Sequence, residues 1–70
     1  MNDYIIENTI IQFIKNRAEQ KESTTSRHIH RRFDITIEKA EKILSELAKK
    51  NIIEEFYDQE YQESRYTIKR

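Results

Sequence analysis

The sequence predicts a small α+β domain in which three helices are followed by a two-stranded β-hairpin. Apolar residues recur at three- and four-residue steps as far as Asn51, which is helical spacing. Beyond Asn51, β-branched and aromatic residues become frequent and partly alternate with polar ones, which is typical of strands. The chain has 70 residues, a length with room for one small core, so we expect a single domain over residues 1–70.

The first helix is expected over residues 3–20, with Asp3 as its cap. Its apolar stripe is broad, because Ile10 and Phe13 lie to one side of it and a second set lies on another. Two interpretations follow. The helix lies across the middle of its own domain, or the second set faces a partner such as another copy of the chain. This second set comprises Tyr4, Ile11 and Ala18.

A second helix is expected over residues 25–33, after a polar stretch that ends in Ser23, Thr24 and Thr25. Side-chain oxygens of these residues accept hydrogen bonds from the free amides of a helix start. Ile29 and Phe33 are four residues apart and would therefore share the buried face.

The third helix is expected over residues 36–50. Asp34 can adopt a left-handed turn conformation, and Thr36 can cap the helix that follows. Asn51 suits a left-handed stop at the other end. One stripe of this helix is apolar and consists of Ala40, Ile43, Leu44 and Leu47.

The hairpin is expected over residues 52–69. Tyr66 and Ile68 alternate with polar neighbours, so both should face inward. In the first strand Ile52 and Ile53 are both apolar, and the pattern leaves open which of them faces the core. The connection between the strands has no glycine, so we expect a loop longer than a tight two-residue turn.

The segment from Thr25 to Thr36, followed by the apolar stripe of the third helix, resembles a helix-turn-helix, and with the hairpin the whole chain resembles a winged helix-turn-helix domain. Ile29 and Phe33 match the apolar pair of the first motif helix, and Ile35 matches the apolar residue after the turn. Two positions depart from the pattern. His30 stands where a small residue usually packs between the helices, which suggests slightly splayed helices or an outward histidine, and Asp34 replaces the turn glycine.

The resemblance implies that the third helix enters the major groove of DNA. Glu38 and Glu41 are awkward on such a helix because they would face a polyanion, although each also fits an ordinary role as a solvated or dipole-complementing acid. Arg27 and Arg31 are one helical turn apart and suit two phosphate contacts, or else form an ordinary solvated face. The expected DNA-binding residues are Ser26, Arg27, Arg31, Arg32, Thr36, Ile37, Glu38, Lys39, Lys42, Ser45, Arg65 and Lys69.

Charge is distributed unevenly in a chain whose formal net charge is zero. Residues 52–63 contain five acidic side chains and no basic one, whereas a wing that contacts phosphates normally carries Arg or Lys. Three tyrosines of the hairpin could stack on unpaired bases or anchor a protein interface, or could simply pack in the core and at its rim. They are Tyr57, Tyr61 and Tyr66.

Other classes of function are disfavoured. The absence of Cys and Gly argues against zinc fingers, thiol chemistry and glycine-rich phosphate loops. His28 and His30 are two residues apart on a predicted helix and point in different directions, so we expect no metal, no cofactor and no catalytic residue. The N-terminus shows neither a signal peptide nor a membrane span, which favours the cytoplasm.

The sequence therefore predicts a DNA-binding protein, a transcriptional regulator that acts as a dimer through its first helix and favours duplex DNA. The alternative is a winged-helix accessory module in a replication or mobile-element complex, where it binds single-stranded DNA or a protein partner. The balanced charge and the acidic hairpin motivate this alternative.

Overall fold

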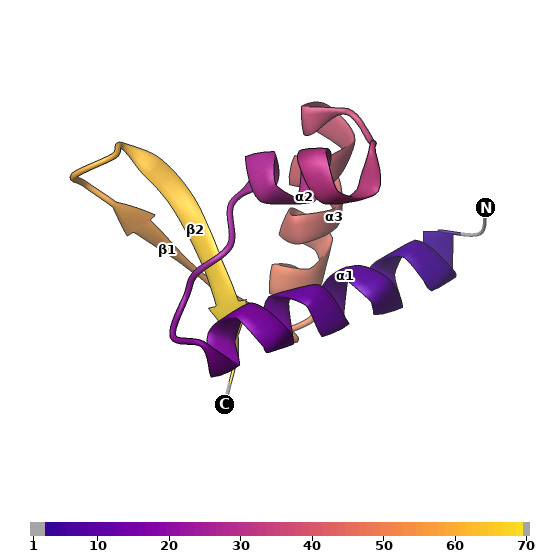
Figure 1. Cartoon of the computed structure of the whole chain (residues 1–70), viewed down its shortest axis with the longest axis horizontal. Helices are drawn as coiled ribbons and strands as arrows, with labels where there is room; N and C mark the ends of the chain where they lie inside the picture. The colour runs from indigo at the N-terminus through magenta and orange to yellow at the C-terminus, as the bar shows by residue number, and fades with distance from the viewer. Residues whose placement is uncertain (1–2, 70) are drawn as a thin grey trace.

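The computed structural model describes residues 3–69, with side chains described for residues 6–69. Helices α1 (Asp3–Glu19), α2 (Ser26–Phe33) and α3 (Ile37–Lys49) precede an antiparallel hairpin formed by β1 (Ile53–Asp58) and β2 (Glu63–Ile68). Figure 1 shows α1 running along one side of the molecule, with α2 and α3 over its middle and the hairpin standing beside them. This is a winged helix-turn-helix arrangement, and the predicted fold class is confirmed.

The predicted ends of α2 and α3 are also confirmed. Thr25 caps α2, and Thr36 caps α3 by accepting a hydrogen bond from the Lys39 amide through its hydroxyl at 3.1 Å. Asp34 ends α2 in the left-handed conformation at φ 55°, and Asn51 follows α3 with φ 62°. These residues carry local chemistry that suits a helix terminus, which is why the sequence located them.

Helix α1 ends in a turn that the sequence pattern had not indicated. Lys21 has φ 61°, and its amide donates to the Ala18 carbonyl at 2.9 Å. The Glu22 amide then donates to the Arg17 carbonyl at 2.9 Å. The chain thereby reverses direction and reaches α2 without glycine. The predicted cap by Asp3 involves a side chain outside the described ones.

The core lies where the three helices meet the base of the hairpin. Ile10 and Ile14 of α1 are fully buried, and Phe13 packs edge-on against Phe33 of α2 with ring centroids 5.6 Å apart. Ile35 packs against this core from the turn between α2 and α3, as predicted. The other buried apolar residues are Ile29, Ala40, Ile43, Leu44, Leu47, Ile53 and Tyr66.

The hairpin joins the core through one face. Ile53 is buried and pairs in register with Ile68, while Ile52 is half-buried, so the structure settles which of the two isoleucines faces the core. Tyr66 is buried as predicted, and its amide and carbonyl both bond to Thr24 at 2.8 Å. This bridge ties β2 to the linker that precedes α2, and the two run side by side in Figure 1.

A four-residue loop over residues 59–62 connects the strands. Asp58 Oδ1 accepts hydrogen bonds from the amides of Glu60 at 2.9 Å and Tyr61 at 3.3 Å. Gln62 supplies the left-handed residue at φ 52°. An aspartate turn therefore replaces a glycine turn, and the expected longer loop is confirmed.

Candidate nucleic-acid interface

Helix α3 presents most of its predicted DNA-contacting residues to solvent. Thr36, Ile37, Glu38, Lys39, Lys42 and Ser45 are all exposed. Ile37 keeps 40% of its surface accessible. The face of α3 opposite the core is thus accessible to a partner. With Glu41 counted, it carries two lysines and two glutamates.

His30 occupies the crossing of α2 and the turn in a way that the sequence did not suggest. Its ring is half-buried and turns to the Ile35 carbonyl, not out to solvent. The Nδ1 atom lies within hydrogen-bond distance of the Ile35 carbonyl oxygen, and a carbonyl only accepts, so Nδ1–H donates. The ring therefore fastens the turn that sets α3 relative to α2.

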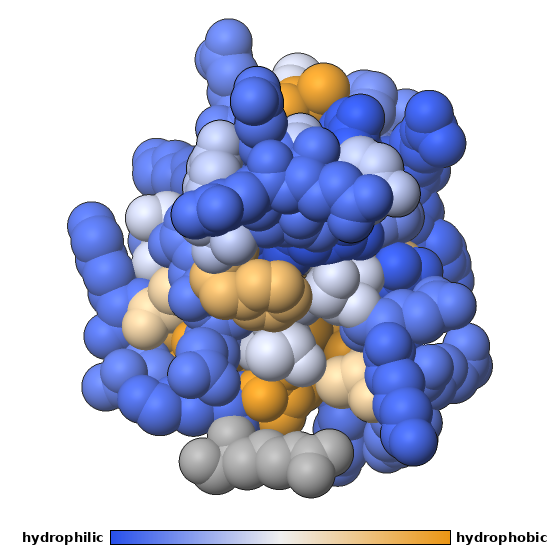
Figure 2. Space-filling view, turned by 90° about the vertical axis from the view of Figure 1, so that its left-hand side faces the viewer, coloured by the Kyte–Doolittle hydropathy of each residue, from blue (hydrophilic) through white to orange (hydrophobic). Residues whose placement is uncertain are grey.

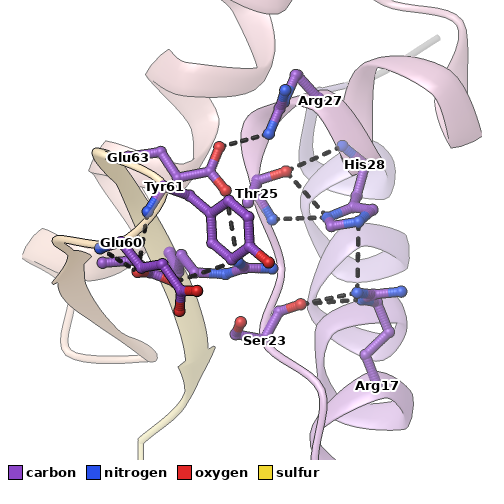
Figure 3. A network of polar contacts seen from close by, with 10 residues as sticks. Arg17, Ser23, Thr25, Arg27, His28, Glu60, Tyr61 and Glu63 are labelled. Atoms are coloured by element: carbon purple, nitrogen blue, oxygen red, sulfur yellow. Dashed lines mark hydrogen bonds and ion pairs between the residues drawn. The ribbon is translucent and has the colours of Figure 1, made fainter.

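The start of α2 is closed by a reciprocal cap between Thr25 and His28. The His28 amide donates to the Thr25 hydroxyl at 3.4 Å, and the Thr25 amide approaches His28 Nδ1 at 2.9 Å. This is the capping-box arrangement, with histidine in the place usually taken by Glu or Gln. Figure 3 shows the ring turned back toward the Thr25 backbone.

Arg17 of α1 completes this corner, and nothing in the residue pattern indicated its role. Its Nη2 donates to the Ser23 carbonyl at 2.8 Å and lies 3.4 Å from His28 Nε2. Its Nη1 forms an ion pair with Glu22 at 3.3 Å. The positive charge of the guanidinium beside the ring favours a neutral imidazole. Burial chiefly, and then the charges of Arg17, Arg65 and Arg27, lower the pKa of His28 below its ordinary value of 6.5, against an opposing effect of Glu63.

The lowered pKa of His28 predicts acid sensitivity of the fold. The unfolded chain takes up a proton on this imidazole near pH 6.5, while the folded chain resists it. The free energy of unfolding should therefore be highest above pH 6.5 and should fall as the pH drops below that value. Urea unfolding of the wild type and of His28→Gln, which keeps a capping acceptor, tests this between about pH 7.5 and pH 5. Parallel profiles for the two proteins would contradict the assignment.

A depression of about 240 Å³ lies at the N-terminal end of α2 and is lined by Thr25, Arg27, His28 and Arg31. The structure thus brings together the two arginines that the sequence had paired, and both are exposed. Arg32 lies further along the helix, where its guanidinium carbon is 5.4 Å from the centroid of the Phe33 ring. The arginines of α2 therefore form an exposed cationic face whose concave part opens at the helix start.

The basic residues of β2 and the C-terminal segment do not extend this face equally. Arg65 Nη1 lies 3.4 Å from Asp58 Oδ2 and 3.4 Å from Glu63 Oε2, so its charge is engaged within the hairpin. Lys69 donates to Asn51 Oδ1 at 3.3 Å, beyond the end of α3. Arg65 is thus connected to the start of α2 through Glu63, which contacts Arg27.

Between α3 and the hairpin runs an open groove of about 520 Å³ whose charged lining is acidic. Glu41 of α3 faces Glu55 and Glu63 of the hairpin across it, and Tyr57 and Tyr66 supply its aromatic surface. Burial raises the pKa of the Tyr66 hydroxyl, and the carboxylates of Glu55 and Glu41 raise it further. Figure 2 shows the hairpin side of the molecule as largely hydrophilic, with a band of hydrophobic atoms across its lower half.

The residues predicted to face a partner from the first helix are partly covered by the domain itself. Ile11 is half-buried and packs against the core. Ala18 is half-buried beside Thr67 and Ile68. The side chain of Tyr4 lies outside the described ones. Helix α1 thus uses much of its broad apolar stripe within its own domain.

Over residues 3–69, no helix has the length and apolar character that crossing a membrane requires. Within the same part of the chain, no three His, Cys, Asp or Glu residues are grouped so that they could hold a metal ion. No protein-family model matches the sequence, and comparison with curated proteins and with solved structures finds no significant similarity.

Proposed function

We propose that this chain is a cytoplasmic DNA-binding protein, a transcriptional regulator of the winged helix-turn-helix type. The observation that carries the proposal is the exposed arginine face of α2, with its depression at Arg27 and Arg31. This face lies at the start of the helix that precedes α3, where a helix-turn-helix protein meets the DNA backbone.

The chemistry of the depression suits a phosphate. Two guanidinium groups offer several N–H donors each and match the oxygens of a phosphate in pairs. The N-terminus of α2 contributes a partial positive charge at the same place. Since phosphate contacts position a protein on a duplex without reading its sequence, this face would supply affinity, and α3 would supply the base contacts.

The groove between α3 and the hairpin constrains how a duplex would approach. Glu41, Glu55 and Glu63 line it, and a phosphate placed there would be repelled. We therefore infer that the duplex lies against α2 and the outer face of α3, where Thr36 and Lys42 are exposed, and not over Ser45, which lines the groove. The hairpin would then not insert into a groove of the DNA.

Dimerisation belongs to the same proposal, because a single module of this size buries little surface on DNA and two half-sites multiply the affinity. The first helix remains the proposed contact. Since Ile11 and Ala18 are half-buried, the contact would use their accessible parts together with neighbouring polar residues.

The acidic groove favours a second candidate function, an accessory module that binds a protein partner or single-stranded DNA in a replication or mobile-element complex. Three carboxylates and an exposed Tyr57, which keeps 60% of its surface accessible, line or border this groove. A basic peptide would match such a lining in charge. Single-stranded DNA would match only the aromatic rings.

The experiment that separates these functions is fluorescence anisotropy with a labelled mixed-sequence duplex and each of its single strands over a salt series. Duplex binding whose logarithmic affinity falls linearly with the logarithm of salt concentration is the expected result. Preference for the single strands would favour the accessory module. No binding to either at low salt would overturn the DNA-binding proposal. Light scattering of the same samples reports whether the chain is a dimer.

A further inference from the structure

One ion pair connects the cationic face of α2 to the hairpin. Arg27 donates through Nη2 to Glu63 Oε1, across 36 positions of sequence. The arginine side chain is 62% exposed and the glutamate side chain 21% exposed. Figure 3 shows the Glu63 carboxylate reaching from the hairpin toward the Arg27 guanidinium. A hairpin carboxylate thus already contacts one of the two arginines that the proposed function assigns to phosphate.

The glutamate is anchored on its own side of this contact. Its second oxygen, Oε2, lies 3.4 Å from Nη1 of Arg65, whose side chain is only 19% exposed. Arg65 in turn pairs with Asp58 at 3.4 Å, the residue that shapes the hairpin loop. Arg65 is therefore the sheltered partner of Glu63, and Arg27 is the exposed partner that solvent or a ligand can reach.

We propose that Glu63 is an internal competitor of nucleic-acid phosphate for Arg27, and that it sets the affinity of this chain for DNA. The inference rests on the proposed function. A carboxylate and a phosphate accept the same guanidinium hydrogen bonds, so both cannot hold Arg27 in the same way. Binding of DNA exchanges one anion for the other on Arg27.

The exchange is feasible because it strands no buried charge. When Arg27 turns to a phosphate, Glu63 keeps its contact with Arg65. The Arg27 side chain is mostly solvated, and an exposed ion pair of this kind is weak. Glu63 therefore lowers the affinity for DNA without preventing binding.

The test measures duplex affinity of the full chain by anisotropy for the wild type and for Glu63→Gln, with Glu60→Gln as the matched control. Glu60 lies in the same hairpin and is exposed, so its substitution removes the same charge without touching Arg27. Glu63→Gln is expected to tighten duplex binding several-fold, on the order of fivefold. Because Arg27 contacts a phosphate in the complex of either protein, the salt slope should stay nearly the same. Glu60→Gln should give a clearly smaller gain.

The same substitution in an Arg27→Ala background decides whether the gain passes through Arg27. The gain from Glu63→Gln should then fall to that of Glu60→Gln. If the wild type binds the duplex and the two glutamine variants change its affinity equally, the inference is wrong and the proposed function stands. A gain that persists without Arg27 would also overturn it. Failure of the wild type and of Glu63→Gln to bind any duplex would overturn the proposed function, and this inference with it. Glu63→Asp, which retains the charge on a shorter side chain, provides a second folded variant and should give an intermediate gain.

Discussion

Replacing Ile29 with alanine is expected to lower the free energy of unfolding by about 2–5 kcal/mol, because the change removes buried methyl and methylene groups and leaves a cavity. Ile29 has no solvent-accessible surface and is the one fully buried side chain of α2. Phe33, the other apolar anchor of this helix, is half-buried. A domain of 70 residues has little stability to spare, so the loss should leave a substantial unfolded population near room temperature.

Ile37→Ala is the matched control, since it makes the same chemical change in a helix at a residue that is 40% exposed. Its effect on the free energy of unfolding should stay below about 1 kcal/mol. Urea unfolding followed by circular dichroism measures both variants. Equal losses would mean that α2 is not held to the domain through Ile29, and the description of the core would then be wrong.

The parts of this fold that the sequence predicted are those governed by local chemistry. Thr25 and Thr36 cap helices because a hydroxyl beside free amides favours a helix start wherever it occurs. Asp34 and Asn51 tolerate a left-handed conformation better than most residues do. Helix boundaries follow from such residues and from apolar spacing, and the structure confirms them within one residue or so.

The parts that the sequence did not predict depend on contacts between distant segments. Ile52 and Ile53 are equally apolar, and only the packing of β1 against α3 and the other helices decides that Ile53 is buried. Lys21 has no intrinsic preference for the left-handed conformation, yet it adopts it at φ 61°. The hydrogen bonds that close the α1 turn and the route of the chain to α2 impose it, and neither can be read from a short window of sequence.

The candidate site likewise contains one feature that residue spacing predicts and several that depend on the fold. Spacing alone paired Arg27 with Arg31, since a helix brings residues four apart onto one face. Spacing could not reveal that Glu63 contacts Arg27 or that Arg17 approaches His28, because these pairs are 36 and 11 positions apart. Nor could it reveal that Glu41 faces the hairpin acids across a groove. The acidic composition of the hairpin was visible in the sequence, but its effect on the approach of DNA required the fold.

Replacing Arg31 and Arg32 together with glutamine is expected to weaken duplex binding at low salt by about tenfold or more. Both side chains are exposed on α2, and neither is held by an ion pair with a described acidic residue, so each can neutralise a phosphate. Loss of two such contacts should reduce the slope of logarithmic affinity against logarithmic salt concentration by about 0.9 for each contact. The affinity difference between the two proteins should therefore shrink as salt is added.

The double variant Lys15→Gln and Lys49→Gln removes the same total charge at two exposed sites, in α1 and in the last turn of α3. Glutamine is a good helix former, so both double variants should fold, and circular dichroism verifies this. Because long-range attraction depends on net charge while contacts depend on position, the lysine variant should lose much less affinity and keep most of its slope. Equal losses in the two variants would show that α2 makes no particular contact with phosphate, and the proposed interface would have to be abandoned.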